Sequence, residues 1–187
     1  MGSIKSTARL AGIMYLTMSV MAGVSFVRGF GNFVVDGDPA ATMRHIPDRE
    51  LIYRLGILND MITNILFLAV VVTLYHLFVD VDRRLSMLML VFVAVPVGMQ
   101  LSSFVDHLAP LTMLQHPGDF APMTEAQRGL VAQSVLGLHR NMGRLVTPFW
   151  GLWLFPFATL VIKSRYFPRV LGVLMMAAGA GYVVTGF

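Results

Sequence analysis

The chain has 187 residues, of which 56% are hydrophobic and 13% are charged, and its mean hydropathy is +0.71. A soluble globule of this length needs more polar surface than this composition supplies, so we expect an integral membrane protein. The net charge of +4 comes from Lys and Arg residues scattered at helix ends, which predicts no nucleic-acid partner. The lack of cysteine excludes disulfides, thiol catalysis and thiolate metal sites.

Five apolar stretches are long enough to cross a bilayer core, which takes about 20 residues per helix. They cover residues 10–27, 55–78, 85–105, 140–162 and 169–187. We therefore predict an all-α bundle of five transmembrane helices in a single domain, residues 1–187. The basic residues of the short loops all fall on one side of such a bundle, which predicts a cytoplasmic N-terminus: Lys5, Arg9, Arg83, Arg84, Lys163, Arg165 and Arg169.

Two outer segments are predicted to form a cap with short amphipathic helices, at residues 38–46 and 106–137. Asp38 before Pro39 is a good start for a short helix that ends near His45. Four prolines and glycines within residues 106–128 predict a loop. Thr124 with Gln127 fits a capping box, and the helix that starts there either continues into the fourth crossing or bends near Gly143.

Polar side chains interrupt the second predicted crossing, in the segment LGILNDMITNILFL at residues 55–68. Asp60 and Asn64 are four residues apart and share one helix face, with Thr63 beside them. An ionisable group inside a membrane faces the protein interior or a wet cavity, because an unpaired carboxylate in lipid is costly. Asp60 is therefore the first candidate for an acid–base group.

Matching polar residues occur at the outer ends of the third and fourth crossings. On the third they form one stripe with an adjoining acid: Gln100, Ser103, His107 and Asp106. On the fourth they open the helix: His139, Arg140, Asn141 and Arg144. Because all three groups lie in the outer half of the bundle, they predict a polar pocket between the second, third and fourth crossings, with Arg144 as the counter-ion of Asp60.

We assign acid–base roles to the titratable members of this pocket, Asp60, Asp106, His107 and His139. Substrate-binding roles go to Asn64, Gln100, Arg140, Asn141, Arg144, Trp150 and Trp153. No HxxxH pair and no carboxylates at ligand spacing support a metal, so we predict neither a metal nor another cofactor. In the simpler alternative, Asp60 and Arg144 form a structural ion pair and the two tryptophans only pack.

Four stretches of the chain resemble a known family: TARLAGIMYL at 7–16, YRLGILND at 53–60, LHRNMGRLVTPFWGLWLFP at 138–156 and KSRYFPRVLGVLMMAAGAGYVV at 163–184. They are similar to the bacterial membrane-protein family catalogued as domain of unknown function 4386. Its most specific signature runs from Ser164 through Pro168, Arg169 and Gly172. The resemblance implies a polytopic fold in a bacterial cytoplasmic membrane and no particular reaction.

Two functions remain open. The first is a cofactor-independent acid–base enzyme, of the isomerase or cyclase type, for a lipophilic small molecule such as an isoprenoid or a polyene. The second is a non-catalytic module that binds membrane lipids or a partner protein, or a carrier subunit. Small-residue faces, on the first helix and at Ala177 and Gly181 of the fifth, permit a homo-oligomer without requiring one.

Overall fold

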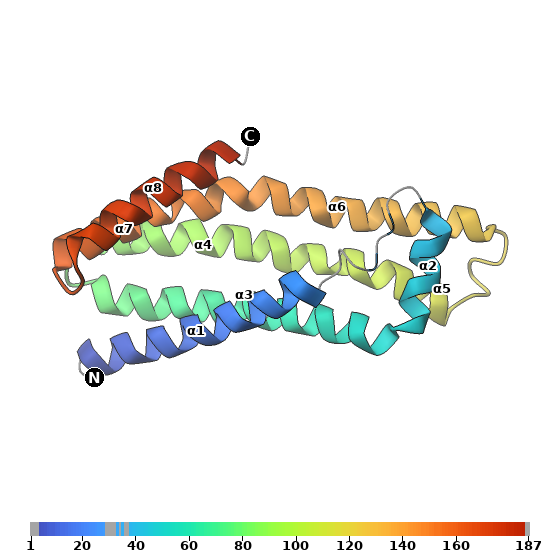
Figure 1. Cartoon of the computed structure of the whole chain (residues 1–187), viewed down its shortest axis with the longest axis horizontal. Coiled ribbons are helices and arrows are strands. Elements are labelled where there is room, and N and C mark those ends of the chain that lie inside the picture. The colour runs from blue at the N-terminus through green and yellow to red at the C-terminus, as the bar shows by residue number, and fades with distance from the viewer. Residues whose placement is uncertain (1–3, 29–32, 34, 36–37, 186–187) are drawn as a thin grey trace.

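The structure, a computed structural model, describes residues 4–28, 33, 35 and 38–185, and its described elements are all helices. Four long rods run along its main axis (Figure 1): α1 (Ile4–Arg28), α3 (Glu50–Phe78), α4 (Arg83–Ser103) and α6 (Glu125–Leu152). Shorter helices extend or cover them: α2 (Pro39–Asp48), η2 (Phe104–His107), α5 (Leu108–Gln115), α7 (Leu154–Ser164) and α8 (Arg169–Thr185). The predicted all-α helical bundle is confirmed.

Four stretches are long and apolar enough to cross a membrane: Ile4–Ser25, Glu50–Phe78, Arg83–Gln115 and Glu125–Ser164. They contain the second, third and fourth predicted crossings and all but the last two residues of the first, and they indicate an integral membrane protein. The fifth apolar helix, Arg169–Thr185, has only 17 residues. The last two residues of the fifth predicted span, 186–187, lie outside the described part of the chain.

The predicted outer cap lies at the end of the bundle opposite the N-terminus, where α2 and α5 meet α6 (Figure 1). Asp38 caps α2 by accepting a hydrogen bond from the amide of Ala41 at 2.9 Å, and both bonds of the Thr124–Gln127 capping box start α6. The prediction of a loop over residues 106–128 is wrong in its first half, because η2 and α5 run to Gln115. Pro110 fits there since a helix's first turn has no intrahelical use for an N–H.

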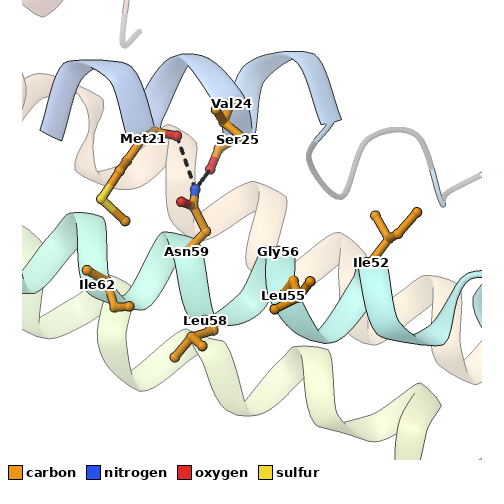
Figure 2. A pocket seen from close by; sticks show the side chains of 9 residues that line it. All are labelled: Met21, Val24, Ser25, Ile52, Leu55, Gly56, Leu58, Asn59 and Ile62. Carbon is orange, nitrogen blue, oxygen red and sulfur yellow. Dashed lines mark hydrogen bonds between the residues drawn. The ribbon is translucent and has the colours of Figure 1, made fainter. Parts of the chain in front are cut away.

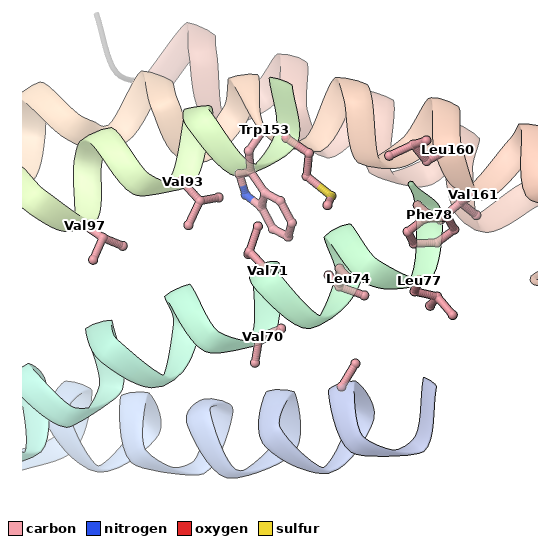
Figure 3. Packing of buried hydrophobic residues seen from close by; sticks show 12 residues of the cluster. Val70, Val71, Leu74, Leu77, Phe78, Val93, Val97, Trp153, Leu160 and Val161 are labelled. Carbon is pink, nitrogen blue, oxygen red and sulfur yellow. The ribbon is translucent and has the colours of Figure 1, made fainter. Parts of the chain in front are cut away.

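Helix α6 continues past Gly143 to Leu152, which answers the open question about that segment. The backbone is interrupted instead at Trp153, between α6 and α7. The side chain of Trp153 is 5% exposed and lies in the main core with Val71 and Val93 (Figure 3). Its ring centroid lies 5.4 Å from that of Phe67, and Trp150 lies 5.3 Å from the same ring. Both tryptophans therefore pack helix against helix.

Helices α6 and α8 meet at a pair of glycines that sequence reasoning did not single out. A Cβ atom built on Gly151 would lie 2.5 Å from the carbonyl oxygen of Gly179, and one on Gly179 would lie 2.9 Å from that of Gly151. A Cβ on Gly181, the predicted packing residue, would meet nothing within 4 Å. The close contact of α6 with α8 thus depends on Gly151 and Gly179, because only glycine lets the backbones approach this far.

An ion pair holds the turn between α3 and α4 to the end of α7. Lys163 Nζ lies 2.7 Å from Asp82 Oδ2, while Asp82 Oδ1 caps α4 by accepting from the Leu85 amide at 3.1 Å. The hydrogen bond from Lys163 holds the pKa of Asp82 below its usual range. Asp82 thus joins three helices at the end of the bundle that holds the N-terminus.

This pair predicts a stability that falls in acid. Because the pKa of Asp82 is lowered by folding, its contribution is present above the carboxyl's unfolded-state pKa and is lost as the pH falls through the folded one. We expect the thermal midpoint of the detergent-solubilised protein to drop below about pH 4. Asp82→Asn keeps a helix cap but removes the charge, so its midpoint should change less over the same range. If the thermal midpoints of the two proteins fall by the same amount as the pH is lowered, this prediction is contradicted.

Candidate functional site

The polar residues at the centre of α3 face α1. Ser25 of α1 donates a hydrogen bond to a carboxylate oxygen of Asp60. Asn59 Nδ2 donates to Ser25 Oγ at 2.6 Å and to the carbonyl oxygen of Met21 at 3.1 Å (Figure 2). Sequence reasoning placed Asp60 in the site but missed Ser25 and Asn59. The signal was the hydroxyl of Ser25 in the otherwise apolar stretch of residues 20–27.

A second group of polar residues joins α4, η2 and α6. Ser103 Oγ lies 3.0 Å from His139 Nδ1, and the rings of His107 and His139 lie with their centroids 4.0 Å apart. His107 is 1% exposed, and its carbonyl oxygen accepts a hydrogen bond from the hydroxyl of Tyr53 at 3.1 Å. The structure therefore brings His107 and His139 together, as the sequence predicts.

The two groups are neighbours, because Asp60 lies near enough to His139 for their charges to affect each other. Residues from α1, α3, α4, η2 and α6 thus form one polar cluster, which we call the outer cluster: Ser25, Asn59, Asp60, Ser103, His107 and His139. Asp60 lies about 27 Å from the end of α3 at Phe78, at 1.5 Å per residue. This length is close to the thickness of a bilayer core, so the cluster lies near one membrane boundary.

The other predicted site residues lie around this cluster or outside it. Asn64 Nδ2 donates to the backbone carbonyl of Asp60 at 3.0 Å, and Gln100 is half-buried one turn before Ser103. Asp106 is also half-buried, beside His107. On α6, the predicted site residues Arg140, Asn141 and Arg144 are exposed.

The proposed partnership of Asp60 with Arg144 is not formed. No ion pair within 4.0 Å joins these two residues in the part of the chain that the structure describes. The hydrogen bond to the Asp60 carboxylate comes instead from Ser25 of α1. Neither the predicted counter-ion nor the predicted structural ion pair therefore explains Asp60.

An open groove lies between α1 and α3 and reaches this cluster. Its volume is about 400 Å³. Its walls are apolar side chains such as Val24, Leu55 and Ile62, and its polar residues are Ser25 and Asn59 (Figure 2). The prediction placed the pocket between the second, third and fourth crossings. The residues that line this groove belong instead to α1 and α3, so only the second crossing was placed correctly.

Metal ligation finds little support among the described residues, where no three or more His, Asp or Glu side chains gather closely enough to hold an ion. The two imidazoles of His107 and His139 are too few for a closed site.

Comparison with known proteins identifies a family. A family model described as "Domain of unknown function (DUF4386)" matches residues 10–187. The chain belongs to this family. No curated protein and no solved structure matches it. Since the family is defined by sequence and not by a reaction, membership of DUF4386 supports the membrane fold, while the site must be interpreted from its own geometry.

Proposed function

We propose that this DUF4386 protein is a cofactor-independent acid–base enzyme, of the isomerase or cyclase type, for a lipophilic small molecule such as an isoprenoid or a polyene. The molecule would occupy the groove between α1 and α3, with the groove on the outer side of a bacterial cytoplasmic membrane and the N-terminus in the cytoplasm. The observation that supports this proposal is an apolar groove whose polar lining residues, Ser25 and Asn59, are hydrogen-bonded to each other and, through Ser25, to the carboxylate of Asp60.

The groove has the composition expected of a site for an apolar ligand. Small-molecule sites are concave and mainly hydrophobic, with a few polar groups that fix orientation. Here Ser25 and Asn59 are those groups, at one place in a wall otherwise made of aliphatic side chains. An isoprenoid or polyene with a hydroxyl or carbonyl group can enter sideways from the lipid, place its chain against α1 and α3, and turn its oxygen toward Ser25.

The chemistry follows from what lies behind Ser25. Its hydroxyl is hydrogen-bonded to Asp60, and Asp60 interacts with His139. A proton taken from a ligand carbon can pass through Ser25 to Asp60, and a proton can return to another carbon by the same path. A double-bond shift or a cyclisation needs no oxidant or reductant, so this proton exchange balances the reaction. Arg140, Asn141 and Arg144, which are exposed on α6, take no part in this proton transfer.

The alternative function, a non-catalytic module, uses the same groove. A groove that opens to the bilayer can hold an acyl chain of an ordinary lipid, with the polar residues serving only to fix α1 on α3. The two functions differ in what stays bound after purification: an enzyme or a specific carrier retains a discrete compound, whereas a packing groove retains bulk phospholipid.

Blocking the groove tests the proposal. Ile62 lines the groove and is 42% exposed, while Ile65 lies one turn further along α3, is 55% exposed and does not line it. We expect mass spectrometry of protein purified in mild detergent to find one discrete apolar compound with the wild type and with Ile65→Trp. Ile62→Trp should retain at least tenfold less, because the indole fills the space. Bulk phospholipid alone in all three samples would refute the proposal.

A further inference from the structure

A second groove lies along α1, toward the N-terminal end of the bundle. Its volume is about 370 Å³, and it lies between α1, α3, Phe157 of α7 and the turn that joins α7 to α8. Ala8, Gly12 and Leu16 form its wall on α1, Leu74 lies on α3, and Phe167 belongs to the turn. Its lining is almost entirely apolar. We call it the inner groove, and it shares no residue with the groove beside Ser25.

Packing explains why this space is open. Helix α1 makes most of its contacts with α3, whereas α7 and α8 pack on each other and on α4 and α6. The bundle is therefore left without a helix between α1 and the turn after α7. The space beside Gly12 is open, since a Cβ atom built there would meet nothing within 4 Å.

Positive charge borders one end of the inner groove. Lys5 precedes Ala8 by three residues and Gly12 by seven, so it continues their stripe on α1 beyond the apolar wall. Across the groove, Phe167 lies between Arg165 and Arg169. All three basic side chains are exposed.

Within the described part of the chain, no acidic residue neutralises these charges. Among the described residues, Lys5, Arg165 and Arg169 form no ion pair within 4.0 Å, whereas the neighbouring Lys163 is paired with Asp82. An apolar channel that ends between uncompensated basic residues is complementary to a molecule with a long hydrocarbon chain and an anionic head. Basic sites between membrane helices recognise anionic lipid headgroups in this way.

We infer that the inner groove binds an anionic phospholipid from the leaflet at the N-terminal end of the bundle. One acyl chain lies against Ala8, Gly12 and Leu16, a path of about 12 Å along α1. The phosphate lies between Lys5 on one side and Arg165 and Arg169 on the other. The lipid thereby occupies the space between α1 and the turn after α7. This inference is independent of any reaction at the outer cluster.

Native mass spectrometry of the full chain tests the inference directly. The protein, delipidated in detergent, is titrated with phosphatidylglycerol or with phosphatidylcholine of the same acyl chains. We expect one tightly bound phosphatidylglycerol and at least tenfold weaker binding of phosphatidylcholine. Equal affinity for the two lipids would overturn the inference.

Two variants separate the headgroup site from the chain site. The double variant Lys5→Gln with Arg165→Gln should weaken phosphatidylglycerol binding about 30-fold. The control double variant, Arg83→Gln with Arg84→Gln, removes the same charge near the start of α4 and should change phosphatidylglycerol binding much less. Gly12→Leu should fill the channel and abolish tight binding of the lipid. Gly23→Leu is its matched control, because Gly23 is also open on α1 but does not line the inner groove.

Circular dichroism and thermal melting establish that each variant is folded. If Gly12→Leu fails to fold, the two charge variants still test the inference, because Lys5 and Arg165 are exposed and their replacement should leave the fold intact. If the two double variants lose equal affinity for phosphatidylglycerol, or if a folded Gly12→Leu protein still binds it tightly, the lipid does not occupy the inner groove.

Discussion

Gly151→Ala is expected to lower the free energy of unfolding by up to about 2 kcal/mol and to loosen α8 from α6. The added Cβ would lie 2.5 Å from the carbonyl oxygen of Gly179 and 2.8 Å from a methyl carbon of Val183. A backbone atom cannot move aside as a side chain can, so the helices must separate. Overpacking of this kind costs about 1–3 kcal/mol or more, which exceeds the gain of about 1 kcal/mol from replacing a helical glycine by alanine.

Gly143→Ala is the matched control for this prediction. Gly143 lies in the same helix, and a Cβ there would meet nothing within 4 Å. Only the helix-propensity gain remains, so this variant should melt at the same temperature as the wild type or higher. Thermal midpoints in detergent measure both changes. A Gly151→Ala protein as stable as Gly143→Ala would mean that α8 does not pack on α6 as described.

Asp60→Asn is expected to reduce turnover by about 10² to 10⁴-fold, the usual contribution of a general acid–base group. The amide has nearly the volume of the carboxylate, and its oxygen can still accept the hydrogen bond from Ser25. It cannot take up a proton, however, so proton exchange with the ligand stops. The assay is conversion of the compound recovered with the wild-type protein, followed together with the thermal midpoint.

The two measurements distinguish a catalytic Asp60 from a structural one. A catalytic role predicts that turnover is lost while the midpoint stays within a few degrees of the wild type. If Asp60 only fixes α1 on α3, the midpoint and the yield of folded protein fall instead, and any conversion continues at the wild-type rate. Asp119→Asn, an exposed acid in the loop before α6, should alter neither quantity.

Sequence patterns predicted the helices well because membrane helices are specified locally. A run of apolar residues fixes a crossing whatever its neighbours are, and the pair of Thr124 and Gln127 fixed the start of α6. The segment after Asp106 was predicted less well. Its prolines suggested a loop, but Pro110 falls in the first turn of α5, where a missing N–H costs nothing.

The site was predicted only in part, because partners across helices depend on helix rotation, which a single sequence does not fix. The stripe of Ser103 and His107 did meet His139. Asp60, by contrast, was predicted from its charge to pair with Arg144. In the structure its carboxylate accepts a hydrogen bond from Ser25 instead. Serine is common in membrane helices and carries no charge, so its place beside Asp60 had too weak a signal in the sequence.

The stretch from Glu125 to Ser164 has one further consequence. Its 40 helical or nearly helical residues measure about 60 Å, twice the thickness of the hydrocarbon layer. Half of this rod must therefore stand in water, together with α2 and α5 packed around it. The outer cluster then lies near the boundary between the bilayer core and water, within reach of both the lipid and the aqueous space.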